Sequence, residues 1–211
     1  RNPAELFLYD PVAGKLIETR KLPALNRDWE DLTHDPAGNL YIGDIGSNRN
    51  ARRNLRIYRY HPVSGALDSI LFRYPDQQAF PPVEERNWNF NCEAMVWFND
   101  SLHLFSKNSF KGNFYTKHYV LPAQPTQSNQ PVEYIAELRD SFLLKDRVVT
   151  GATLSADGQT LAQPVVSHFN YSSGSSVLLA RLWQDAAPGA SLDWPRAQLF
   201  APLGMHSAVL E

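Results

Sequence analysis

Short runs in which apolar and polar residues alternate dominate the chain, and most are bounded by Gly, Pro, Asn or Asp. A two-residue period over four to eight residues is typical of β-strands. The pattern predicts strands within residues 4–10, 39–44, 54–60, 69–74, 94–98, 101–106, 132–138, 153–162 and 176–183. No long amphipathic helix stands out, so the sequence predicts an all-β protein.

One segment, residues 132–146, fits two periods. Its first half alternates as a strand does, whereas apolar residues recur at a helical spacing through its second half. We expect a strand followed by a loop or a short helix.

Three segments repeat the order strand, polar turn, strand: WEDLTHDPAGNLYIGD, CEAMVWFNDSLHLFS and TGATLSADGQTLAQP. Each is typical of a β-hairpin, because its turn concentrates residues that accept turn dihedrals. In a superposition Glu30 aligns with Glu93, and Thr150 or Gly151 takes this place in the third copy.

The final Glu211 is the expected start of a fourth copy, so repeat starts lie near residues 30, 93, 151 and 211. Hairpin units that bury their faces only against neighbours are typical of a β-propeller. We therefore expect residues 1–211 to form a single propeller domain with four-stranded antiparallel blades. It would be incomplete in this chain, since the fourth copy has only begun.

Composition excludes several classes of protein. The net charge is −2, so no broad basic field is available for a nucleic-acid backbone. Cys92 is the only cysteine, which excludes an internal disulfide and a thiolate zinc cluster. No apolar run is long enough to predict a membrane span, and the first residues lack the pattern of a signal peptide.

Residues 26–48 concentrate carboxylates and amides around one short strand. The turn DPAGN accounts for Asp35 and Asn39 as turn formers, which leaves the carboxylates that open and close the hairpin. Two interpretations stay open for Glu30, Asp44 and the aligned Glu93. They hold a hard cation such as calcium, which prefers oxygen ligands, or they hydrogen-bond to backbone amides of a neighbouring blade.

Five arginines lie within eleven residues: Arg49, Arg52, Arg53, Arg56 and Arg59. Guanidinium groups bind oxyanions bidentately, so Arg52 and Arg53 are candidates for an anion-binding site. The alternative is an ordinary solvated hairpin, because Arg56 faces the side opposite to its apolar neighbours.

Motifs that identify a reaction are absent. The chain has no HExxH, no GxSxG and no Gly-rich phosphate loop, and a dispersed Ser-His-Asp triad stays open because a triad need not be local. No catalytic residue is identified. We expect the aromatic residues to pack between blades, and Cys92 to be buried and inert.

Taken together, the Trp-Glu-Asp start, the Gly-Asp-x-Gly-x-Asn loop and the Glu-Ala-Met copy resemble bacterial propellers labelled esterase-like or phytase-like. More distantly they are similar to six-bladed gluconolactonase-type propellers. The resemblance covers roughly residues 5–165. It implies a six-bladed parent, a periplasmic, cell-surface or secreted location, and a divalent cation in the central channel, held by a glutamate that opens an inner strand.

Glu30 and Glu93 match that glutamate. Asp-Leu follows Glu30 where lactonases commonly have Gly-Pro, and the third copy lacks a carboxylate. The first expected function is a binding module that takes a small molecule or a protein at one propeller face, with a structural cation such as calcium. The alternative is a metal-dependent hydrolase of phosphoesters, esters or lactones, with Glu30, Glu93 and Asp44 holding the ion.

Overall fold

The computed structural model describes residues 2–10, 12–107, 113–125, 132–144 and 148–154, with the backbone of residues 161–162 and 165–166. Within these residues the chain forms β-strands, one turn of 3-10 helix, η1 (Glu85–Asn87), and no α-helix, which confirms the all-β prediction. None of the described segments forms a helix with the length and apolar character needed to cross a membrane.

The first large sheet has the strand order β10-β6-β5-β4-β3. Its strands are β3 (Trp29–His34), β4 (Leu40–Asp44), β5 (Leu55–Tyr60), β6 (Leu67–Arg73) and β10 (Glu133–Ile135). The first four are antiparallel, as expected, whereas β10 joins the outer edge of β6 in parallel. A strand was predicted within residues 132–138, but its parallel pairing with β6 was not. This pairing satisfies backbone groups that an exposed edge would leave unpaired.

The second large sheet is antiparallel, in the order β11-β9-β8-β7. Its strands are β7 (Asn91–Phe98), β8 (Ser101–Lys107), β9 (Tyr115–Pro122) and β11 (Glu137–Leu143). The ambiguous segment therefore forms two strands, one in each sheet, and the expected loop or short helix in its second half is wrong. The free edge of β9 pairs with β11 and overrides the helical spacing of the apolar residues.

Three smaller pairs complete the described chain: β1 (Glu5–Asp10) with β2 (Lys15–Lys21), β12 (Val148–Val149) with β15 (Val165–Val166), and β13 (Thr153–Leu154) with β14 (Leu161–Ala162). The last pair confirms the predicted third hairpin. The strand predicted within residues 176–183 and the repeat start at Glu211 lie outside the described residues.

The first predicted turn has the expected chemistry. Asn39 donates from its backbone nitrogen and its Nδ2 to the two Asp35 carboxylate oxygens, at 2.9 and 2.6 Å. Gly38 adopts a φ of 82°, which a side chain would disfavour. Asp35 and Asn39 are thus turn formers. The candidate ligands within residues 26–48 are therefore the carboxylates at the two ends of the hairpin.

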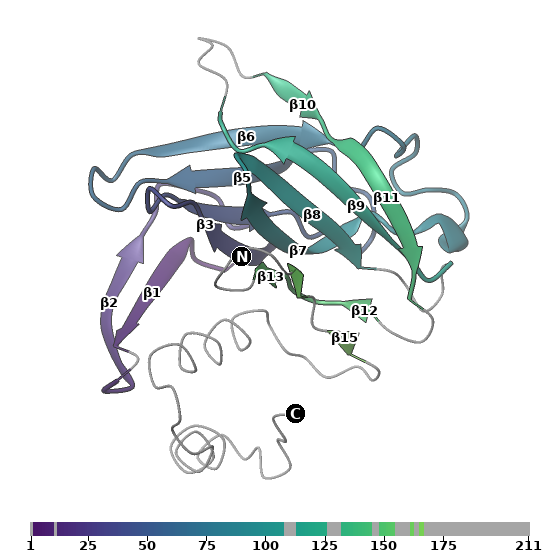
Figure 1. Ribbon diagram of the computed structural model, residues 1–211. Coiled ribbons are helices and arrows are strands. Elements are labelled where there is room, and N and C mark those ends of the chain that lie inside the picture. Colours follow the sequence, from purple (N-terminus) through teal and green to yellow (C-terminus); the bar gives the residue numbers. More distant parts are fainter. Residues whose placement is uncertain are drawn as a thin grey trace.

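The two large sheets pack face to face, with β3 and β7 close together (Figure 1). Fully buried residues of both sheets form the shared core, among them Tyr41, Ile57, Phe72, Met95, Leu104 and Tyr119. Two hydrogen bonds fix the relative position of the inner strands: Met95 N donates to Asp31 Oδ2 at 2.7 Å, and Trp97 N donates to Thr33 Oγ1 at 3.1 Å. This alignment brings the starts of β3 and β7 together.

Candidate carboxylate site

Each of the two inner strands contains a β-bulge at its glutamate. In the first hairpin Trp29 pairs with Asp44 and Asp31 with Gly43, so Glu30 is the extra residue. In the second hairpin the same irregularity, between Cys92 and Ala94, makes Glu93 the extra residue. Bulges re-aim side chains and interrupt the strand alternation. The two glutamates that align in the sequence therefore also occupy equivalent positions in the fold.

The structure brings Glu30 close enough to Glu93 for their charges to interact. Burial, together with the charges of Glu93 and Asp28, raises the pKa of Glu30 to about 9. A carboxyl group in this environment keeps its proton near neutral pH. Asp28, which also lies within hydrogen-bonding reach of Glu30, belongs to the site although the sequence analysis did not select it.

Glu93 differs from Glu30 because it has a cation of its own. Lys107, the last residue of β8, places its Nζ 2.8 Å from Glu93 Oε2. Asn91 donates through its Nδ2 to Glu93 Oε1, also at 2.8 Å. The Lys107 charge lowers the pKa of Glu30 as well, without offsetting burial. The site thus combines three carboxyl groups with one ammonium group.

The loop after β4 closes over the carboxylates. A Cβ on Gly46 would collide with Glu30 Oε1 and would lie 2.5 Å from the Asp28 carboxylate, so a side chain there would displace both carboxylates. Ser47 N donates to Asn91 Oδ1 at 2.5 Å, and Asn48 Nδ2 lies 3.5 Å from Asp28 Oδ2. The Gly-Asp-x-Gly-x-Asn loop therefore connects the two bulges.

Asp44, the third predicted ligand, has other partners. Its side chain is fully buried, and Oδ1 accepts hydrogen bonds from Asp28 N at 2.9 Å and from Arg52 NH1 at 3.2 Å. Arg52 also donates to the carbonyl oxygens of Gly46 and Asp44, at 2.7 and 3.1 Å. Arg52, paired with Asp44, thus holds the loop through a hydrogen bond to its backbone.

The two predicted anion-binding arginines have separate environments. Arg52 is engaged with Asp44 and with loop carbonyl groups, as described above. The Arg53 guanidinium lies 4.0 Å from the centroid of the Phe80 ring, a cation–π arrangement. An anion site that uses Arg52 and Arg53 together remains a prediction, and the internal hydrogen bonds of Arg52 give that residue a structural role.

Asp31, next to the first bulge, joins three parts of the chain. Its carboxylate accepts hydrogen bonds from the backbone N–H groups of Leu32 in β3, Met95 in β7 and Ala152 beside β13. Burial nevertheless raises its pKa to about 7, because desolvation outweighs these bonds. The sequence left open that a carboxylate bonds to backbone amides of a neighbouring unit. Asp31 forms such bonds, although the repeat alignment did not single it out.

The donor types at the bulges suit a hard cation, but their arrangement is not a preformed coordination shell. Among the described residues no group of three or more His, Cys, Asp and Glu side chains is arranged to hold a metal ion. Asp28, Glu30 and Glu93 offer carboxylate oxygens of the kind that calcium prefers. Lys107 occupies one Glu93 oxygen, so a cation requires this ion pair to open.

Cys92 follows the expectation for a structural thiol. It is fully buried, and burial raises its pKa to about 12, which keeps the unreactive thiol form. Cys92 precedes Glu93 as Trp29 precedes Glu30, so both bulges rest on a packed side chain.

Comparisons with known proteins assign no family. No family model matches the sequence, and no curated protein is significantly similar to it. The resemblance to esterase-like and phytase-like propellers therefore remains a prediction.

Proposed function

We propose that the protein is a β-propeller-type binding module in which the bulged glutamates of successive blades hold a divalent cation, with calcium as the preferred ion. The observation that carries the proposal is the pair of equivalent bulges, which places Glu30 and Glu93 close enough for their charges to interact. The third hairpin, at the expected spacing, supports a propeller as the parent fold.

The charges at the site favour a cation over other ligands. With Glu30 protonated, Asp28 and Glu93 carry two negative charges against the single positive charge of Lys107. Glu30 adds a third negative charge when it gives up its proton, a step that burial and the charges of Glu93 and Asp28 oppose. Asp28, Glu30 and Glu93 are the residues that would hold the ion.

A bound cation has a structural consequence in this proposal. Asp28 and Glu30 belong to the start of the first sheet, whereas Glu93 belongs to the second. Shared ligands would join the two sheets at one end of their inner strands, where the loop from Gly46 to Asn48 lies. That loop would then be fixed as part of a face on which a small molecule or a protein docks.

Thermal unfolding in calcium and in chelator tests the proposal. A ligand that binds only the folded state at about 100 times its Kd adds about 2.7 kcal/mol of stability, so calcium should raise Tm by several degrees. Glu30→Gln and Glu93→Gln should each remove most of this shift. Glu84→Gln is the matched control, because Glu84 is exposed and pairs with Arg86. An identical Tm in calcium and chelator would contradict the proposal.

The hydrolase alternative is favoured by one observation, the proton that Glu30 keeps near neutral pH. A carboxylic acid with a pKa near or above 7 is suited to act as a general acid. Hydrolysis of 4-nitrophenyl acetate and 4-nitrophenyl phosphate tests the alternative in wild type and in Glu30→Gln. Calcium-dependent turnover that the substitution abolishes would establish the hydrolase, and calcium binding without turnover would favour the binding module.

A further inference from the structure

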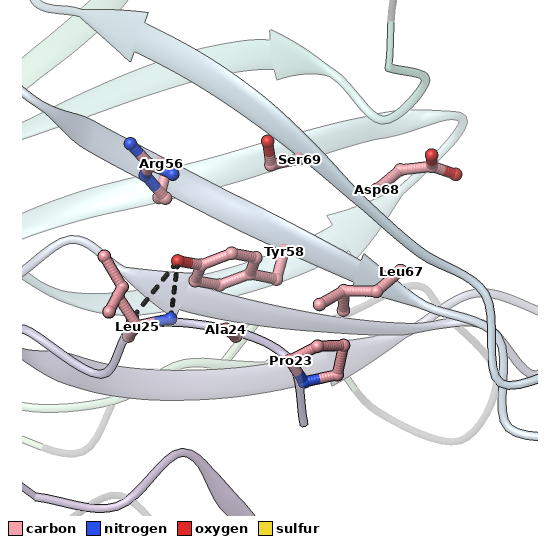
Figure 2. Close-up of a pocket in the computed structure, with 8 residues that line it drawn as sticks. All are labelled: Pro23, Ala24, Leu25, Arg56, Tyr58, Leu67, Asp68 and Ser69. Carbon is pink, nitrogen blue, oxygen red and sulfur yellow. Dashed lines mark hydrogen bonds between the residues drawn. The ribbon is translucent and has the colours of Figure 1, made fainter. Parts of the chain in front are cut away.

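A second site lies on the face of the first sheet that is turned away from the second sheet. A cavity of about 370 Å³ opens between the segment of residues 23–25 and strands β5 and β6 (Figure 2). Its apolar side is formed by Pro23, Tyr58 and Leu67, and its polar side by Arg56 and Ser69. A volume in this range suits a small ligand with an apolar body and a few polar groups.

Tyr58 fixes the wall of the cavity. Its hydroxyl donates to Leu25 O and accepts from Leu25 N, both at 3.1 Å, as the dashed lines in Figure 2 show. Both hydrogen-bonding functions of the hydroxyl are thereby used, and the crossing segment is held above the sheet. The ring of Tyr58 thus forms part of the cavity wall. The Tyr58 hydroxyl proton is already donated to Leu25 O and is not available to a ligand.

Arg56 lines the cavity with a guanidinium group that lacks a hydrogen-bond partner among the described residues. Within the described part of the chain, no hydrogen bond or ion pair involves its side chain, and its Nε is buried without an acceptor. The guanidinium carbon lies 5.8 Å from the centroid of the Tyr58 ring. A buried N–H group without an acceptor is costly, and a planar guanidinium with free donors is suited to a carboxylate or phosphate group.

The neighbouring charges leave Arg56 with a positive surplus. Asp44 is its partner across the β4–β5 pair, but the Asp44 carboxylate already forms an ion pair with Arg52 at 3.2 Å. Among the described residues the Asp44 carboxylate thus pairs with Arg52 and forms no ion pair with Arg56. Asp68, at the rim of the cavity, lies opposite Arg59 in the β5–β6 register, and Figure 2 shows its carboxylate directed away from Arg56.

We propose that this cavity binds a small organic anion, with a carboxylate or phosphate group on Arg56 and Ser69 and an apolar body on Tyr58, Leu67 and Pro23. Ser69 lies opposite Tyr58 in the β5–β6 register, and its hydroxyl adds a second donor to the lining of the cavity. The site is independent of the carboxylate site at the bulges. It places the anion-binding role that the sequence suggested for Arg52 and Arg53 on a third arginine of the same cluster.

Titrations followed by ¹H–¹⁵N NMR test the proposal on the whole chain. Benzoate and phenyl phosphate are the anionic probes, and benzamide is the uncharged analogue of the same shape. We expect at least one anion to bind with a Kd in the low millimolar range or tighter and to shift the Arg56 Nε–Hε and Leu25 N–H signals. Benzamide should bind about tenfold more weakly, because it cannot pair with a guanidinium.

Substitutions locate the binding. Arg56→Gln should weaken the anion about tenfold or more, whereas Arg53→Gln, which alters an arginine stacked on Phe80, should leave its Kd unchanged. Arg56→Lys keeps the positive charge but lacks the paired N–H donors of a guanidinium group, so it should give an intermediate Kd. This variant replaces Arg56→Gln if the latter fails to fold. Absence of binding by both anions, equal binding of benzamide, or binding that survives both Arg56 substitutions would overturn the proposal.

Discussion

The two bulged hairpins are built alike but place different residues beside their glutamates. Residues in register show why: Lys107 in the second hairpin corresponds to Ile45 in the first. Lys107 forms an ion pair with Glu93, whereas Ile45 is fully buried and folds over Gly43. Glu30 has no cation from its own hairpin, and its pKa rises. A repeated backbone therefore fixes where a carboxylate lies, while the residue on the next strand determines whether a cation lies beside it.

The same comparison separates the residues beside the bulges. Asp44 corresponds to Ser106 and Asp31 to Ala94. Ser106 Oγ accepts a hydrogen bond from Lys117 N at 2.9 Å, a local link to the adjacent strand. Asp44 and Asp31 instead bind the loop and the neighbouring sheet. The first hairpin thus carries the buried charges that hold the units together, and the second hairpin supplies the cation.

Loss of the Arg52 guanidinium should have the largest effect. Arg52→Met leaves the fully buried Asp44 carboxylate without its ion pair, and breaking one side of a buried pair costs about 3–5 kcal/mol. Urea unfolding followed by circular dichroism measures the loss. Arg53→Met is the control, since Arg53 stacks on Phe80 outside this network. Equal stability of the two variants would show that Asp44 does not depend on Arg52.

Asp31→Ala should come next. The substitution removes the acceptor for the N–H groups of Leu32, Met95 and Ala152, and buried donors without partners cost about 1–3 kcal/mol each before relaxation. We expect a loss of about 2–4 kcal/mol in the free energy of unfolding. Asp68→Ala, at an exposed position, is the control. A loss as small as that of the control would remove Asp31 as the connecting residue.

The substitution Lys107→Ile, which gives the second hairpin the residue type of Ile45 in the first, should lower the free energy of unfolding less than the two substitutions above. Lys107→Ile removes the ion pair with Glu93, whose partners are largely buried, and a hydrogen bond between charged groups contributes about 1.5–3 kcal/mol. Because the Lys107 charge lowers the pKa of Glu30, that pKa should also rise above its value of about 9. Urea unfolding and a carboxyl NMR titration give the two readouts. An unchanged Glu30 titration would contradict the shared site.

The last prediction concerns the pH dependence of stability, which tests the proton on Glu30 rather than the loss of a contact. The pKa of Glu30 is raised from 4.5 to about 9, so between these values the folded protein holds a proton that the unfolded chain has lost. Stability from Glu30 is thus fully present below pH 4.5 and is lost as pH rises toward 9. Asp31 contributes in the same direction, from its ordinary pKa of 3.8 to about 7.

Glu30→Gln isolates that contribution, because glutamine resembles the protonated acid and does not titrate. Asp31 is half titrated at about pH 7 and contributes equally to both proteins, so the fall in stability from about pH 7 to about pH 9 should be shallower in Glu30→Gln than in wild type. Urea unfolding at three pH values measures it. The same slope in both proteins would exclude a proton held on Glu30.

Local patterns in the sequence predicted most of the hairpins, because alternation and turn residues are local signals. Strands β2 and β9 were missed since their sequences, KLIETRK and YTKHYVLP, mix charged residues into the alternation. The pairing of β10 with β6 depends on which edge is free, a property of the whole fold that a local pattern does not contain.

The alignment of Glu30 with Glu93 correctly paired two residues that the fold brings together, but the bulges could not be predicted from it. Asp28 had a detectable signal, because it precedes Glu30 by the same two residues that separate Asn91 from Glu93. No pattern in the sequence indicated that Lys107 contacts Glu93 or that Arg52 contacts Asp44. Their partners come from a neighbouring strand end and from a loop, and only the register of the sheets shows those contacts.

The pKa of Glu30 tests the account most directly. Carbon-13 NMR of glutamate side-chain carboxyl groups, assigned with Glu30→Gln and Glu93→Gln, follows the titration in the absence of divalent cations. We predict a pKa of about 9 for Glu30, lowered when Glu93→Gln removes the neighbouring charge. A pKa near the ordinary 4.5 that is insensitive to Glu93 would show that the two bulged glutamates do not form one site.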